Sequence, residues 1–443
     1  MDLVISGGTV VTAEAVFQAD VGIRQGRIAA VGEGLTGRRT LDARGRLVTP
    51  GGVDVHVHLQ YRVGGLDTAD SFATGTRAAA LGGTTTVLDF VEAEEDEPLL
   101  DALERRRAQA AEGARIDYGF HMTVKPGDLG KLDQVPGVVR AGCPSFKHYM
   151  AYGFCLSDGQ LLRSFRALAA AGGLAIVHAE NWDVIRTLVD ERLAAGDRHP
   201  RQHPRCRPAA FEAQAAGRAL DLAELTGVPL YVFHVTCGEV VERLAAARSR
   251  GLAAWGETCP QYLFLDDQVF EAQGPLPICS PPIREKAQQE RLRAALLRGD
   301  LQVVSTDHCP FPAAAKHAAG DFSRVPGGVP SLEARMMLVR GLPGMTPSRW
   351  VDACCTTPAR LMGLASKGRI QVGADADLVV WDPEAERVLG PDTLHENVDW
   401  TPFAGLRVRG VPEWVLGRGE FLVEEGRAVA PEGRGRFLER TLT

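Results

Sequence analysis

Short apolar runs alternate with longer helical patterns through the middle of the chain. Eight runs have the length and the apolar or β-branched composition of buried strands. They are VDVHVHL (53–59), TTTVLDF (84–90), DYGFHM (117–122), PSFKHYM (144–150), LAIVHAE (174–180), LYVFHVT (230–236), LAAWGETC (252–259) and LQVVSTDH (301–308). Segments rich in Ala and Leu separate most of them, as in residues 160–173 and 211–227. Eight strands that alternate with helices predict an α/β fold, a (β/α)8 barrel.

The two ends of the chain have a different pattern. The first fifty residues alternate short β-type runs with glycine turns, and a similar pattern returns between residues 366 and 430. We therefore expect residues 1–50 and 366–430 to form one small β-sandwich beside a catalytic barrel of residues 51–365. Residues 431–443 are expected to be a C-terminal arm, the part of the chain nearest to disorder.

Composition and charge exclude several classes of function. The 443 residues are 45% hydrophobic and 24% charged, with a net charge of -7 and no basic stripe that would indicate nucleic acid or an anionic membrane. No segment has the character of a signal peptide or a membrane span, so the expected location is the cytoplasm. The nine scattered cysteines contain no CxxC pair and indicate reduced thiols.

Polar residues recur at the carboxyl ends of the predicted strands, where a barrel places its active site. A lone histidine at such a place is more often structural than catalytic, and HxH by itself is a weak motif. The joint occurrence is harder to explain structurally, because each residue independently falls at the same end of a predicted barrel strand. Histidine and carboxylate are also the ligands of hydrolytic zinc sites. The residues concerned are His56, His58, Lys147, His178, His234 and Asp307.

Lys147 is unexpected in the apolar run CPSFKHYMAY (143–152), because a buried ammonium is costly unless it is paired, neutralised or modified. The other histidines are given ordinary roles. His308 is expected to orient Asp307. A structural role, or a supporting role behind the metal ligands, is expected for His121 and His148, and solvated loop positions for His199, His203, His317 and His395.

A series of motifs in a fixed order resembles the cyclic amidohydrolases, and within them the dihydropyrimidinase and hydantoinase group. The resemblance covers nearly the whole chain. The motifs are GGVDVHVHL, GGTTTVLDF, SFKHYMAY, HAEN, HVTC, ETCPQYL, CSPPIR, STDHCPF, VPGGVPSLEARM and GADADLVVWDP.

The resemblance implies two divalent metal ions per subunit, expected to be Zn²⁺, and a carbon dioxide-derived carbamate on Lys147 that bridges them. By the same comparison, His56, His58 and Asp307 hold the more buried ion, and His178 and His234 hold the second.

Asp307 is implied as the proton carrier and Tyr152 as the donor to the developing oxyanion. Ser280 and Gly327 are implied to bind the ring amide through their backbone, although many relatives have Asn in place of Gly327. The resemblance also implies a homotetramer.

The expected reaction is hydrolysis of a ring amide in dihydropyrimidines or 5-substituted hydantoins. Allantoinase is a neighbouring alternative. Dihydroorotase is less favoured because Gln60 stands where dihydroorotases typically carry an arginine, although Arg62 lies two residues further on. A non-enzymatic relative of the collapsin response mediator type is disfavoured, since all six ligand positions and Tyr152 are retained.

Overall fold

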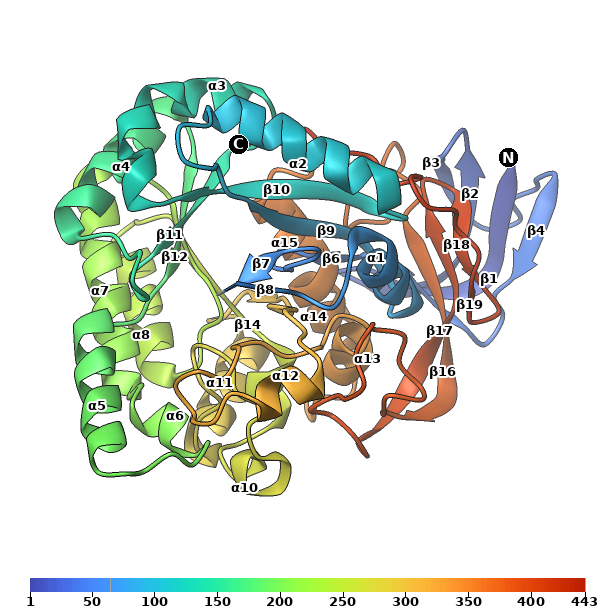
Figure 1. Ribbon diagram of the computed structural model, residues 1–443. Helices are drawn as coiled ribbons and strands as arrows, with labels where there is room; N and C mark the ends of the chain where they lie inside the picture. The colour runs from blue at the N-terminus through green and yellow to red at the C-terminus, as the bar shows by residue number, and fades with distance from the viewer. Residues whose placement is uncertain (64, 443) are drawn as a thin grey trace.

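A computed structural model describes residues 1–63 and 65–442 (Figure 1). Its central element is an eight-stranded parallel sheet in the order β15-β14-β13-β12-β11-β10-β9-β6. Each strand lies within one of the eight predicted runs or extends it by one or two residues, which confirms the predicted barrel. The strands are β6 (Gly52–Asp54), β9 (Thr84–Val91), β10 (Asp117–Val124), β11 (Ser145–Tyr149), β12 (Leu174–His178), β13 (Leu230–Val232), β14 (Ala254–Thr258) and β15 (Val303–Val304).

Helices surround these strands (Figure 1). They are α1 (Phe72–Leu81), α2 (Leu99–Gly113), η1 (Pro126–Gln134), α3 (Val135–Arg140), α4 (Asp158–Ala171), α5 (Trp182–Ala194), α6 (Gln202–Arg205), α7 (Ala209–Thr226), α8 (Gly238–Ser249), α9 (Pro260–Phe264), α10 (Val269–Gln273), α11 (Lys286–Arg298), α12 (Ala313–His317), α13 (Arg335–Arg340), α14 (Pro347–Val351), η2 (Asp352–Thr356) and α15 (Thr357–Leu361).

Local sequence explains where several helices begin and end. Ser157 accepts a hydrogen bond from the backbone N–H of Gln160 at the start of α4, and Gly172 ends that helix in the left-handed region. Ser71 caps α1 in the same way. None of the helices in the described part of the chain is long and apolar enough to cross a membrane.

The two ends of the chain meet in a separate nine-stranded sheet, as predicted. Its order is β19-β18-β17-β16-β5-β1-β2-β3, with β4 paired to β1, so N- and C-terminal strands lie side by side (Figure 1). The strands are β1 (Leu3–Val11), β2 (Val16–Arg24), β3 (Arg27–Gly32), β4 (Arg39–Asp42), β5 (Leu47–Pro50), β16 (Leu378–Val388), β17 (Arg407–Gly417), β18 (Glu420–Glu424) and β19 (Arg427–Ala428). The boundaries at residues 50, 365 and 430 stay predictions.

The C-terminal segment packs on the barrel, although its composition indicated the part of the chain nearest to disorder. The N–H of Leu438 donates to the carbonyl of Tyr118 at 2.7 Å, next to a parallel bridge between Tyr118 and Phe437. Arg440 is buried and donates to the Ser145 hydroxyl at 2.8 Å. This guanidinium satisfies polar groups at the base of β11, which explains why a polar tail is ordered there.

Candidate active site

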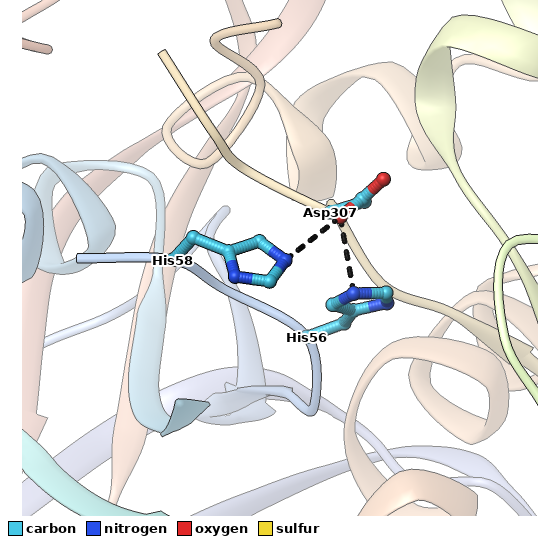
Figure 2. A group of neighbouring side chains, drawn as sticks. All are labelled: His56, His58 and Asp307. Atoms are coloured by element: carbon cyan, nitrogen blue, oxygen red, sulfur yellow. Dashed lines mark ion pairs between the residues drawn. The ribbon is translucent and has the colours of Figure 1, made fainter. Parts of the chain in front are cut away.

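His56, His58 and Asp307 meet beyond the carboxyl ends of the first and last barrel strands (Figure 2). The Nε2 atoms of His56 and His58 lie 3.0 and 3.2 Å from Oδ1 of Asp307. All three side chains are buried, and one ligand atom from each falls within 4.8 Å of the other two. Two imidazoles and a carboxylate at this spacing are a donor set suited to a divalent metal ion.

The charges of the three groups depend on one another. Burial favours the neutral imidazole, but the carboxylates of Asp307 and Glu257 outweigh it and raise the pKa of His56. Burial likewise favours the protonated acid, yet His56 and His58 lower the pKa of Asp307 well below its ordinary value. Asp307 is therefore held as a carboxylate, the form that binds a cation.

Neighbouring carboxylates leave specific histidine nitrogens free for a metal. Oε1 of Glu257 lies 2.6 Å from Nδ1 of His56, so the Nε2 of that ring is left facing Asp307. Oε2 of Glu180 lies 2.7 Å from Nε2 of His178, which leaves Nδ1 of that ring. A carboxylate that accepts from one ring nitrogen fixes the tautomer and orients the other nitrogen toward a metal.

The buried Nδ1 atoms of His58 and His234 have no hydrogen-bond partner among the residues that the structure describes. His234 lies beside both His178 and His56 in this cluster. Its ring centroid is 4.6 Å from that of His178 and 5.4 Å from that of His56. Unpaired buried nitrogens in a cluster of imidazoles fit a metal site better than a packed interior, where such atoms are normally hydrogen-bonded.

Lys147 is only 1% exposed. Its Nζ lies 4.0 Å from the ring centroid of Phe233 and 5.2 Å from that of Tyr149, and no salt bridge to it forms within the described residues. Burial lowers the pKa of Lys147 to about 7, opposed by the more distant charges of Asp307 and Glu257. The lysine that looked misplaced in the sequence is thus buried without an ion-pair partner.

All nine residues predicted to form the site line one cavity of about 390 Å³. Its wall includes the six predicted metal ligands together with Tyr152, Ser280 and Gly327. Only His56, His58 and Asp307 form a group of three whose ligand atoms all lie within 4.8 Å of one another among the described residues, whereas His178 and His234 lie beside these three. The roles assigned to these residues stay predictions, but the sequence placed them on one surface correctly.

Three of the site residues have backbone angles that are unusual for residues other than glycine. The φ values are +71° for Tyr152, +40° for His234 and +51° for Asp307. Such conformations are costly and cluster at functional sites, where the surrounding structure imposes them. They also explain why strands β13 and β15 end two or three residues before His234 and Asp307, which the sequence analysis had placed at the ends of these strands. Lys147, in contrast, lies within β11 rather than at its end.

Two histidines have surroundings that the sequence did not indicate. His203, predicted to be solvated, is buried in α6 and its Nε2 lies 2.8 Å from the carbonyl of Cys279. His308, predicted to orient Asp307, instead pairs with Asp70 at 3.0 Å. The predictions for His121 and His148 hold, because both are buried and hydrogen-bonded away from solvent.

Glu257 and Glu180 were missed as partners of the metal-site histidines. Each lies in a motif that the sequence displayed, ETCPQYL and HAEN, and Glu180 follows His178 by two residues. That spacing, and the position of Glu257 at the end of a predicted strand, were the available signals. The guanidinium of Arg207 pairs with Glu180 and lies 5.8 Å from the Tyr152 ring centroid, so it connects the histidine to the tyrosine.

Comparisons with known proteins agree with this geometry. The profile of the amidohydrolase family matches residues 47–420. A D-hydantoinase from Streptomyces coelicolor is 45% identical over 99% of this chain and 97% of that protein. A D-hydantoinase crystal structure is 42% identical, with a TM-score of 0.97 over 100% of this chain and 99% of that one.

A dihydropyrimidinase from Brevibacillus agri is 40% identical, with a TM-score of 0.96 over 100% of this chain and 99% of that one. The family implies a metal-dependent active site, and the His56, His58 and Asp307 group supplies suitable ligands. The chain belongs to the amidohydrolase family, in its hydantoinase and dihydropyrimidinase branch.

Proposed function

We propose that this protein hydrolyses a ring amide bond in neutral cyclic ureides, either dihydropyrimidines or 5-substituted hydantoins. The observation that carries the proposal is the set of four histidines, an aspartate and an unpaired buried lysine around one cavity. Relatives named as hydantoinases and dihydropyrimidinases over the full chain support the same reaction class. A cavity of about 390 Å³ accommodates a small cyclic substrate.

Two divalent cations, in our proposal Zn²⁺, would be held by His56, His58 and Asp307 on one side and by His178 and His234 on the other. When bound, they would polarise the ring carbonyl and increase the acidity of a water molecule. Lys147 would serve both cations as a carbamate. The ammonium form has no lone pair for a metal, but the neutral amine uses its lone pair to form an N–C bond to carbon dioxide and then releases one proton. The product is a carbamate anion with two oxygens.

Asp307 is assigned the proton transfer. It accepts a proton from the attacking water as the O–C bond forms and delivers it to the ring nitrogen as the C–N bond breaks. The second proton of the water is released to solvent, so the products are a carboxylate and a ureido group in one open chain. The two imidazoles favour the carboxylate form of Asp307, and this is the form that can accept the proton.

Tyr152 is assigned as a donor to the carbonyl oxygen while negative charge develops on it. Burial raises its pKa above the ordinary value, against the opposing effects of Arg207 and Ser280, so the phenol keeps its proton near neutral pH. Ser280 and Gly327 line the same cavity and would bind the ring amide through their backbone groups.

The outer part of the cavity favours an apolar ring substituent. Its lining includes Val63, Leu66, Phe154 and Val325. Arg62 also lines it, but its guanidinium is exposed and donates to the carbonyl of Gly65 at 3.2 Å. Gln60 is not part of the lining. Arg324 also lines the cavity, and its side chain is 78% exposed. Neither guanidinium is therefore a desolvated partner for the carboxylate of dihydroorotate, which disfavours dihydroorotase.

Turnover of a small substrate panel tests the proposal. We expect kcat/KM for dihydrouracil or 5-phenylhydantoin to exceed that for dihydroorotate and allantoin at least roughly tenfold, the ratio that ~1.4 kcal/mol of lost stabilisation produces. Preference for dihydroorotate or allantoin would overturn the assignment of substrate. Absence of turnover by the metal-loaded protein on every cyclic ureide would instead favour a non-enzymatic role. A homotetramer, which rests on the resemblance, and a cytoplasmic location, which rests on the sequence pattern and the scattered cysteines, are part of the same proposal.

A further inference from the structure

Two buried basic side chains that the proposed chemistry does not use lie behind Ser280. They are His203 and Lys316, and each donates to a backbone carbonyl of the residues just before it. Nζ of Lys316 lies 2.8 Å from the carbonyl oxygen of Ile278, and Nε2 of His203 lies 2.8 Å from that of Cys279. We call this pair of contacts the carbonyl clamp.

The clamp leaves the backbone N–H and C=O of one residue, Ser280, unpaired within the described chain. The Tyr262 hydroxyl donates to the carbonyl of Pro281 at 2.7 Å, so the carbonyls of residues 278, 279 and 281 are all engaged. The N–H and C=O of Ser280 have no hydrogen-bond partner within residues 1–63 and 65–442. A half-buried residue whose backbone N–H and C=O are both unused beside a cavity is prepared to bind a ligand that carries an acceptor and a donor.

Lys316 holds the two predicted ring-binding segments together. The Ile278 carbonyl that accepts from its ammonium also accepts the N–H of Gly328 at 3.0 Å. Gly328 has a φ of +148°, and a Cβ atom there would lie 2.2 Å from the carbonyl oxygen of Cys309. The loop that carries Gly327 is therefore fixed against its neighbours, and Lys316 lies at the junction.

The burial of Lys316 is difficult to explain as packing alone. The residue is 1% exposed, and no carboxylate lies within ion-pair distance of it in the described chain. Its Nζ lies 5.4 Å from the ring centroid of Trp400. Burying an amine without an ionic partner costs free energy. We therefore interpret its hydrogen bond to Ile278 as functional. An apolar residue of the same length would pack there without that cost.

His203 acts on the peptide that carries the Ser280 N–H. A carbonyl can only accept, so Nε2 of His203 carries the hydrogen and donates it to Cys279. Burial lowers the pKa of His203 to about 3, which keeps the ring neutral. Donation to the carbonyl of a peptide polarises the N–H of the same peptide, because hydrogen bonds in a chain strengthen one another. The strengthened donor is the Ser280 N–H.

We infer that His203 and Lys316 are positioning residues that hold the Ser280 and Gly327 backbone in the geometry that binds the substrate's ring amide. This inference rests on the proposed function, because it takes the cyclic ureide as the ligand. Loss of either side chain should weaken binding of the ring equally in the ground state and the transition state. Such a loss raises KM and leaves kcat nearly unchanged.

Matched variants separate positioning from stability. His203→Phe and Lys316→Met remove the donors, whereas His203→Gln and Lys316→Gln keep a shorter donor. Lys367→Met is the control, because Lys367 is similarly buried but pairs with Asp117 and Asp377, far from Ser280 in the fold. KM, kcat, bound metal and the midpoint of thermal unfolding are measured for each protein with 5-phenylhydantoin and dihydrouracil.

We expect each donor-less variant to raise KM about threefold to tenfold, the effect of one net hydrogen bond, with the parent's metal content and kcat. The Gln variants should recover part of the loss, and Lys367→Met should lower the unfolding midpoint without changing KM. Unchanged KM in the donor-less variants overturns the clamp, and so does an equal effect in Lys367→Met. If one donor-less variant does not fold, the change in KM is read from the Gln variant at that position and from both variants at the other position. A parent that hydrolyses neither substrate overturns the proposed function and the clamp with it.

Discussion

The Nε2 of His56 and the Oδ1 of Asp307 lie 3.0 Å apart and join the two ends of the barrel sheet. β6 and β15 are its outer strands, and they are not paired with each other along their described lengths. Just beyond them, Val57 and His308 form an isolated parallel bridge. A cation bound between His56 and Asp307 would therefore reinforce this closure of the barrel.

Removal of the metal should lower stability. A ligand present at 100 times its dissociation constant stabilises the folded state by about 2.7 kcal/mol, and that contribution is lost on chelation. We expect a chelator to lower the midpoint of thermal unfolding by several degrees and added Zn²⁺ to restore it. His58→Ala should respond much less to the same treatment. Equal midpoints for the parent with and without chelator would exclude a role of the cation in closing the barrel.

Lys147→Ala should lose both bound metal and turnover. The variant removes the proposed carbamate and leaves an apolar gap beside Phe233. An alanine side chain offers no oxygen to a metal ion. A short carboxylic acid supplied in solution should restore part of both, because it offers two oxygens of similar shape. Metal analysis and turnover with and without the acid measure the effect. Full metal content and activity in Lys147→Ala would contradict the bridging role.

The barrel and the site were largely readable from the sequence, because both depend on periodic patterns. Continuous apolar runs such as TTTVLDF are what a strand buried on both faces requires, and barrel geometry brings the carboxyl ends together. This is why His178 and His234, 56 residues apart in sequence, were correctly placed on one cavity.

The hydrogen-bond partners of individual side chains could not be predicted from the sequence. The pairing of His308 with Asp70 joins residues 238 positions apart, and nothing in either local sequence selects it over Asp307. His203 was expected at a solvated loop position, yet it lies in α6 and its Nε2 is next to the carbonyl of Cys279. Such contacts depend on side-chain direction within the completed fold, which hydrophobic periodicity does not specify.

Glu257→Gln should weaken metal binding without removing a ligand. Oε1 of Glu257 lies 2.6 Å from Nδ1 of His56, and Oε2 accepts from the Tyr231 hydroxyl at 3.1 Å. An amide keeps the shape but loses the charge that raises the basicity of the imidazole. Replacing a partner of this kind typically costs 10- to 100-fold in metal affinity, on the order expected here. Competition with a chelator of known affinity measures it, and Glu242→Gln on the surface is the control. An affinity equal to the parent's would show that Glu257 does not tune His56.

Glu396 should make stability depend on pH between about 4.5 and 7. Burial raises its pKa from 4.5 to about 7, with Glu333 and Asp70 adding to the shift and His308 opposing it. Within that window the folded protein binds a proton that the unfolded chain has released, so stability falls as the pH rises. The contribution is on the order of 3 kcal/mol, at ~1.36 kcal/mol per pKa unit.

Glu396→Gln, a neutral isostere, should remove that part of the pH dependence. Chemical unfolding of both proteins at a series of pH values gives the difference in free energy. We expect the difference to change in favour of the variant as the pH rises from 4.5 to 7 and to level off above 7. A difference that stays constant across this window would show that Glu396 is ionised in the folded protein.

Asp307→Asn tests the proton transfer directly. The amide retains the size of the side chain and an oxygen that can face His56 and His58, so the fold should persist. It cannot accept a proton from water, and general acid–base catalysis of this kind is worth roughly 10²–10⁴-fold in rate. We expect kcat to fall by at least that range, with further loss if less metal is bound. Metal content is therefore measured on the same sample, and activity is expressed per loaded site. A variant that retains its metal and remains within about tenfold of the parent would assign the proton transfer to another group that lines the cavity.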